Sequence, residues 1–132
     1  MGIGRRDYTW GFLNEAAGEG RYRESFMGFF SEAIDPWAES VIYTYTVATG
    51  YRLGINRIYV SSDFGSYNLI TLGKNGVMVM QGYFTDAHIF DISDVNPLYF
   101  EAGDVLDITI QNRDDIIASF LGGVYGIKEY LI

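Results

Sequence analysis

Cysteine is absent from this chain of 132 residues, and its absence excludes several classes of protein. Without a thiol there is no disulfide framework, no cysteine-based zinc cluster and no cysteine nucleophile. Small secreted domains often depend on disulfides. We therefore expect either a reducing compartment or an assembly that stabilises the fold by other contacts.

Histidine is nearly absent too, because His88 is the only one. It lies in a strand-like stretch, where a single histidine usually has a structural role. A redox-metal site of the cupin kind needs several histidines and a glutamate, so this chemistry is excluded. The chain has no G-x-S-x-G nucleophile motif and no Walker loop, and no pair of carboxylates stands out as a glycosidase site. The sequence therefore predicts a protein that is not an enzyme.

Long apolar runs are also lacking. No window approaches the roughly 18 consecutive apolar residues that a membrane span requires. Arg5 and Arg6 near the N-terminus are not followed by an apolar stretch of signal-peptide length. We therefore expect synthesis in the cytoplasm without a secretion signal, and no membrane partner.

Positive charge is scarce after the first 30 residues. The net charge is -8, and in residues 1–30 four arginines balance four acidic residues, so the whole excess lies in residues 31–132. An acidic body repels phosphate, and we therefore do not expect nucleic acid as a partner. Such a charge is typical of a surface that keeps a protein soluble.

Aromatic residues, in contrast, are abundant, with 11 Tyr, 9 Phe and 2 Trp. Tyrosine and tryptophan suit contact surfaces, where one end of the ring is buried and the other is wet. Aromatic residues also simply favour strands. Composition alone leaves both interpretations open.

The most informative stretch is residues 99–112, in which a turn cluster at 101–104 precedes a strictly alternating segment. The polar-side positions are Val105, Asp107, Thr109 and Gln111, and the apolar-side positions are Leu106, Ile108 and Ile110. Alternation with a period of two is typical of a strand with one wet and one buried face.

Similar signals recur from residue 40 onward. Strands are expected at 41–47, 51–61, 67–72, 77–81, 83–92, 98–100, 105–111 and 116–131. The period breaks between Ile55 and Ile58, which predicts a bulge near Asn56, and Asn75-Gly76 is a strong hairpin signal. Seven or eight short strands in about 92 residues predict an all-β fold, a jelly-roll-like antiparallel sandwich.

Residues 1–38 differ from the rest because they mix glycine, charge and large rings without sustained alternation. We assign them to an aromatic-rich N-terminal arm that contacts other subunits, and residues 39–132 to the sandwich domain. Within the arm, residues 24–34 could form a short helix, or residues 19–30 could pair as an edge strand. Deleting residues 1–30 is expected to leave a folded sandwich that no longer assembles.

Candidate interface residues come from the arm and from the first expected strand. They are Trp10, Phe12, Tyr22, Phe26, Phe29, Phe30, Trp37, Tyr43 and Tyr45. Tyr43 and Tyr45 share one face of a strand, where they could form a sugar-stacking platform, a subunit interface or ordinary cross-strand packing.

No cofactor is expected, and calcium is the only metal for which the sequence offers ligands. Asn112, Asp114 and Asp115 place hard oxygen atoms in one loop, which makes them weak calcium candidates. Asp91 and Asp94 near Asn96 form a similar group. No spacing matches an EF-hand, and clustered Asp and Asn in turns mostly serve turn geometry.

Three motifs in residues 41–126 resemble small jelly-roll virion structural proteins of tailed phages and related viruses. The first is Y-T-V-x-x-G at residues 45–50, leading into a strand that ends in Ser-Ser. The second is F-x-x-G-D-x-L-x-I at residues 100–108, with Asn112 after that strand, and the third is G-x-x-G at residues 123–126.

The resemblance implies a non-enzymatic capsid decoration, head-completion or tail-associated protein that is made in the host cytoplasm and resides in the virion. The implied partners are further copies of the chain, as a trimer or higher homo-oligomer, and other virion proteins. No catalytic residue is carried over. The alternative is a β-sandwich module that binds carbohydrate or a receptor.

Overall fold

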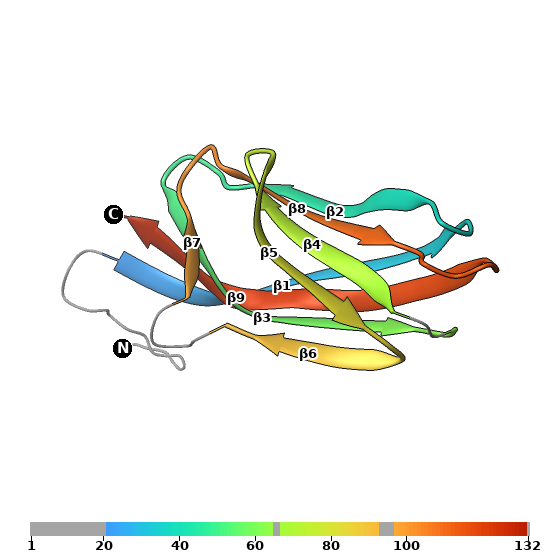
Figure 1. Ribbon diagram of the computed structural model, residues 1–132. Coiled ribbons are helices and arrows are strands. Elements are labelled where there is room, and N and C mark those ends of the chain that lie inside the picture. Colours follow the sequence, from blue (N-terminus) through green and yellow to red (C-terminus); the bar gives the residue numbers. More distant parts are fainter. Residues whose placement is uncertain (1–20, 65–66, 93–96, 132) are drawn as a thin grey trace.

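The computed structural model describes residues 21–64, 67–92 and 97–131, and every regular element within these ranges is a β-strand. The strands are β1 (Arg21–Ile34), β2 (Glu39–Thr46), β3 (Tyr51–Ser62), β4 (Asn68–Lys74), β5 (Val77–Phe84), β6 (Ala87–Asp91), β7 (Leu98–Phe100), β8 (Val105–Gln111) and β9 (Ala118–Leu131). They form two stacked antiparallel sheets (Figure 1). The expected all-β sandwich is confirmed.

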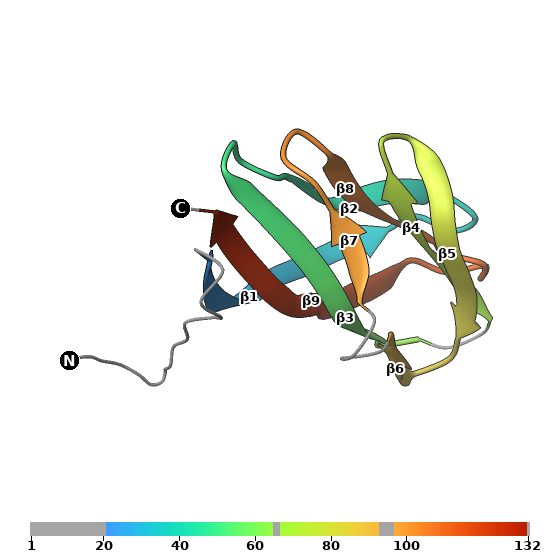
Figure 2. The same ribbon diagram turned by 90° about the vertical axis from the view of Figure 1, so that its left-hand side faces the viewer.

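Sheet A has the strand order β1-β9-β3-β6, with β7 also paired to β3, and sheet B has the order β2-β8-β4-β5. The pairs β1–β9, β2–β8 and β4–β5 are nested, with the outermost pair formed by the first and last strands. The chain therefore pairs like one long hairpin that is rolled into two layers. β6 and β7 pair with successive parts of β3 and occupy the place of one strand. This order is that of an eight-stranded jelly roll, and Figure 2 shows it from the end where β9 finishes.

The core lies between the two sheets and follows the alternation in the sequence. Leu106, Ile108 and Ile110 on β8 are fully buried, as expected for the dry side of that strand. In β3 the pairing with β9 shifts register between Ile55 and Arg57, which confirms the bulge near Asn56. The extra residue lets both Ile55 and Ile58 point inward although they are three positions apart.

The boundary expected at residue 38 is wrong, because β1 pairs with β9 along its whole length and is a strand of the sandwich. Phe26, Phe30 and Ile34 on β1 are buried in the core. The helix considered for residues 24–34 is therefore wrong, and the edge-strand alternative describes β1. Trp10 and Phe12 lie outside the described residues. Deleting residues 1–30 would remove two core phenylalanines and would not test assembly alone.

The strand expected at 83–92 is also divided. β5 ends at Phe84, and β6 begins at Ala87 after a turn in which Asp86 has a φ of 55°. This turn carries the chain from sheet B to sheet A, which is why the apolar residues on its two sides do not form one strand.

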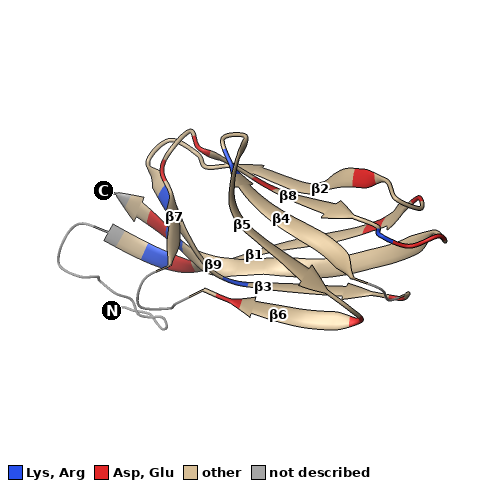
Figure 3. Cartoon of the chain, viewed as in Figure 1, with Lys and Arg blue, Asp and Glu red and all other residues tan. Residues whose placement is uncertain are grey.

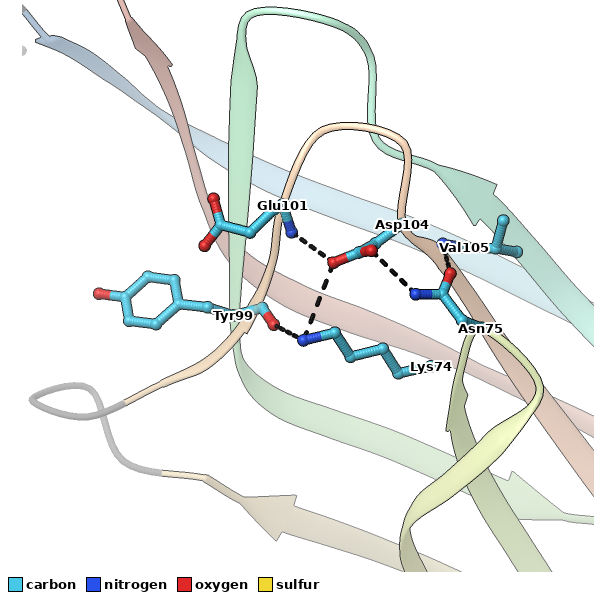
Figure 4. A network of polar contacts seen from close by, with 6 residues as sticks. All are labelled: Lys74, Asn75, Tyr99, Glu101, Asp104 and Val105. Carbon is cyan, nitrogen blue, oxygen red and sulfur yellow. Dashed lines mark hydrogen bonds and ion pairs between the residues drawn. The ribbon is translucent and has the colours of Figure 1, made fainter.

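A polar network joins the β4–β5 hairpin to the turn before β8 (Figure 4). Asn75 and Gly76 both have positive φ, 54° and 83°, as a tight hairpin of the Asn-Gly kind requires. Asp104 accepts hydrogen bonds from Asn75 Nδ2 at 2.8 Å and from the Glu101 amide at 2.7 Å. Lys74 Nζ lies 3.8 Å from the same carboxylate.

These contacts stabilise the charged form of the carboxylate. The side-chain hydrogen bond from Asn75, the backbone hydrogen bond from Glu101 and the charge of Lys74 together hold the pKa of Asp104 below its usual value. Gly103, with a φ of 88°, places Asp104 in this position. The G-D motif at residues 103–104 therefore has a structural role, because it fixes one end of the sandwich.

Candidate interaction surface

The outer face of sheet A carries a row of side chains that crosses four strands. In the strand register Phe29 lies beside Gly123, Gly123 beside Tyr59, and Tyr59 beside Ile89. Neighbouring rows add Met27, Tyr125 and Leu121. We call Met27, Phe29, Tyr59, Ile89, Leu121 and Tyr125 the apolar face. Phe29 is 66% exposed and Met27 is 60% exposed.

On β1, β3 and β9 each of these residues points outward, since both of its neighbours in sequence are buried. Phe29 lies between Gly28 and Phe30, and Tyr59 lies between Ile58 and Val60, all of which are buried. Strand geometry sends alternate side chains to opposite faces. β1 therefore carries apolar side chains both on its inner side, toward the core, and on its outer side. Because both sides of β1 are apolar in the middle of the strand, the sequence there shows no alternation of polar and apolar residues.

Gly123 makes room for one ring of the apolar face. A side chain at this position would begin 2.8 Å from the Tyr125 hydroxyl, which shows that the tyrosine lies across the glycine. The Tyr125 ring meets Phe29 edge to face, with the ring centres 6.2 Å apart. On its other side, Tyr125 lines a shallow depression together with Asn56, Arg57, Tyr59 and Ile89.

Charged residues border the apolar face. Arg57 pairs with Asp91 at 2.8 Å on one side. Glu129 is 4% exposed and lies between Arg23 at 3.1 Å and Arg52 at 2.9 Å near one end of the sheet. Figure 3 shows charge near the ends of β1 and β9 and none along their middle. An apolar centre with a polar rim is typical of a contact surface.

Tyr43 and Tyr45 point inward from β2 and close the side of the sandwich between β1 and β2. The Tyr45 ring lies 4.9 Å from the ring of Phe26, and the Tyr43 hydroxyl lies over Gly28, where an added Cβ would overlap it. Burial raises the pKa of Tyr43, and the neighbouring Tyr45 adds to the shift. Both rings are half-buried packing residues, which is one of the three roles considered for them.

The remaining interface candidates fall into two groups. Phe26 and Phe30 belong to the core, whereas Tyr22, Phe29 and Trp37 are exposed. Of the candidates that the structure describes, only Phe29 lies on the apolar face. The other members of this face were missed by sequence reasoning. They lie on strands far apart in the chain, and the wet side of β3 and β9 was the signal that could have found Tyr59 and Tyr125.

Asn112 uses its side chain to hold the corner before β9. Its Nδ2 donates to the carbonyl oxygens of Ile34 and Ile116, both at 2.9 Å, and its Oδ1 accepts from the Asp114 amide at 3.1 Å. Asp115 accepts a hydrogen bond from Trp37 Nε1 at 3.0 Å. These contacts give Asn112 a role in turn geometry and tie Asp115 to Trp37.

Two polar atoms in this corner are buried without a hydrogen-bond partner among the described residues, Asn68 Nδ2 and Asp114 Oδ2. The oxygen of Asn68 already accepts from the Arg113 amide at 3.0 Å, so its unpartnered nitrogen is a donor, which does not bind a cation, whereas Asp114 Oδ2 is an acceptor. In the described ranges no group of three or more His, Asp or Glu side chains is placed to hold a metal ion.

No model of a protein family matches this chain, and no curated protein matches it. Within residues 21–64, 67–92 and 97–131 there is no helix long and apolar enough to cross a membrane. The surfaces of the molecule are therefore the basis for assigning a function.

Proposed function

We propose that this chain is a non-enzymatic structural protein of a virion, of the capsid decoration, head-completion or tail-associated kind, which assembles with copies of itself and with other virion proteins. The observation that carries this proposal is the apolar face. Its exposed apolar side chains gather on one face, and a patch of this kind usually marks a contact with another protein.

The jelly-roll topology agrees with the resemblance of residues 41–126 to virion proteins. The same fold carries many unrelated functions, so topology gives weaker support than the surface does. A scaffold made of two rigid sheets holds the rings of the apolar face in fixed positions, and this favours binding to a partner of matching shape.

Three titratable residues on or beside the apolar face are engaged in other contacts. His88 lies against the ring of Phe90, with ring centres 4.4 Å apart. Arg57 and Asp91, beside the depression on the apolar face, form an ion pair with each other. These contacts support a surface that binds and does not catalyse.

The test is the absolute mass of the purified protein by light scattering over a range of concentrations, compared between two lysine variants. Phe29→Lys changes the apolar face, and Val41→Lys changes the outer face of sheet B at a residue that is 58% exposed. We expect a discrete trimer or larger oligomer that Phe29→Lys dissociates and Val41→Lys leaves intact. A wild-type monomer at every concentration, or equal effects of the two variants, would contradict the proposal.

The depression beside Tyr59 and Tyr125 favours a second candidate function, a module that binds carbohydrate or a receptor. Two rings next to the polar side chains of Asn56 and Arg57 are the groups that stack on a sugar and hydrogen-bond to it. A glycan array would decide between them, with Tyr59→Ala as the variant expected to lose binding. An array without hits leaves the structural role as the proposal.

A further inference from the structure

The two sheets have four edges, and three of these edges are protected against pairing with another chain. β6 and β7, which share one edge along β3, are only five and three residues long. β2 has a register shift between Val41 and Tyr43, and β5 has an extra residue opposite the step from Leu72 to Gly73. Short length and bulges are the usual devices that stop edge-to-edge association.

The strand at the fourth edge, β1, has none of these devices. Its 14 residues pair with β9 without a register shift. Residues 25–31 include neither a proline nor a charged side chain, and Figure 3 shows the middle of the strand free of charge. Since β1 is the last strand of sheet A among the described elements, one side of its backbone has no strand hydrogen-bonded to it. A long edge strand without a bulge and with an uncharged middle is a template for another strand.

We propose that β1 pairs with β1 of a second copy of this chain, antiparallel and about a two-fold axis at Gly28, so that the two A sheets become one. This rests on the proposed function, in which the chain forms a larger oligomer, and the two-fold pair is one contact within an oligomer that has an even number of chains. The inference adds the surface, the partner and the register. A two-fold contact of this kind is self-complementary, because the same strand serves both sides.

The register follows from which side chains would face each other. With the axis at Gly28, Met27 lies opposite Phe29 of the second copy and Ser25 lies opposite Ser31. On the inner side Phe26 lies opposite Phe30. Apolar residues therefore meet apolar residues and serines meet serines, which are favourable cross-strand pairs.

Neighbouring registers are worse. An axis at Met27 sets Ser25 against Phe29, and an axis at Phe29 sets Phe26 against Glu32. An axis that falls between two residues would set inner side chains of one copy on the outer face of the joined sheet. Of the three axes centred on a residue, the one at Gly28 gives the outer face two apolar pairs, because Met27 lies opposite Phe29 in both directions, whereas the other two axes give one.

One pair in this register is unfavourable, and it offers a test. Glu24 lies opposite Glu32 of the second copy, although Lys128 lies 3.6 Å from Glu24 and Ser40 donates a hydrogen bond to Glu32. Glu32→Lys turns two repulsions into two attractions, so the dissociation constant should fall several-fold. Glu39→Lys, the same charge change on β2, should leave it unchanged.

Cysteine cross-linking tests the register directly, because the chain has no cysteine of its own. Ser25→Cys and Ser31→Cys are prepared as separate full-length variants, mixed and oxidised. We expect a disulfide-linked dimer as the main product of the mixture and only background cross-linking of either variant alone. Cross-linking of a single variant, or none in the mixture, would overturn the proposal.

A second measurement covers the case in which the disulfide geometry is poor. Met27→Lys removes two cross-strand pairs from a two-fold contact and should raise the dissociation constant about tenfold, whereas Val41→Lys should not. An oligomer that survives Met27→Lys and gives no mixed cross-link overturns the β1 pairing and leaves the proposed function standing. A wild-type protein that is monomeric at every concentration overturns both.

Discussion

The two outer faces of the sandwich are built from the same kind of strand and differ in their central rows. The central row on sheet A consists of Phe29, Gly123, Tyr59 and Ile89. The central row on sheet B consists of Val41, Thr109, Thr71 and Gln81. On sheet B, polar side chains of this row form a hydrogen bond with each other, since Gln81 Nε2 donates to Thr71 Oγ1 at 3.0 Å.

The difference shows which residues the fold needs and which it leaves free. Both sheets must have apolar inner faces, because these faces form the core. Nothing in the sandwich itself requires an apolar outer face, and a threonine-rich face forms an equally regular sheet. The rings on sheet A are therefore the basis on which we propose a partner.

The largest expected effect on stability distinguishes the buried side of β1 from its exposed side. Phe30→Ala should lower the free energy of unfolding by about 3–5 kcal/mol, because Phe30 is buried in the core. Phe29→Ala should lower it by less than about 1 kcal/mol, because Phe29 is exposed. Urea unfolding of each variant gives both values. Equal losses would show that the apolar face supports the fold itself.

Two adjacent glycines give the next test. A methyl group at Gly122 would overlap the backbone carbonyl of Tyr59, so Gly122→Ala should lower the free energy of unfolding by about 1–3 kcal/mol. At Gly123 the methyl group meets the movable end of Tyr125, and the loss should stay below about 1 kcal/mol. Thermal unfolding of both variants tests this order, and a costlier Gly123→Ala would contradict the arrangement of the outer face.

Making sheet B resemble sheet A should change association with little effect on stability. The double variant Thr71→Ile and Thr109→Ile places two apolar side chains in the central row of sheet B. The free energy of unfolding should change by no more than about 1 kcal/mol, while light scattering should detect an additional, concentration-dependent association. If no new association appears, exposed apolar side chains on a flat sheet are not sufficient for contact.

The smallest effect concerns the end of the sandwich, away from both faces. The pKa of Asp104 is lowered in the folded state, so its contribution to stability is present above the carboxyl's ordinary pKa and is lost as the pH falls through the lowered value. Asp104→Asn should melt a few degrees below the wild type at neutral pH, and the gap should narrow at acidic pH. A constant gap would show that the charge of Asp104 contributes nothing.

Much of the fold could be predicted from local patterns. The strict alternation of residues 105–111 gave the buried side of β8, and Asn75-Gly76 gave the β4–β5 turn. The broken period after Ile55 gave the bulge of β3. Each of these signals depends on the geometry of a few consecutive residues, so the sequence contains it completely.

β1 was mistaken for part of an arm for the opposite reason. A strand with apolar residues on both faces shows no alternation, and Met27 and Phe29 therefore conceal the pattern of Phe26 and Phe30. Its partner β9 lies about a hundred residues away in sequence, and no local signal connects the two strands.

The sequence by itself determined the fold class, the turns and most of the buried positions, because strand periodicity and turn chemistry act over a few residues. Only the tertiary structure decided that Phe29, Tyr59 and Ile89 stand in one row. Their positions depend on the register of three separate strand pairs, and that register is set by the packing of the whole core.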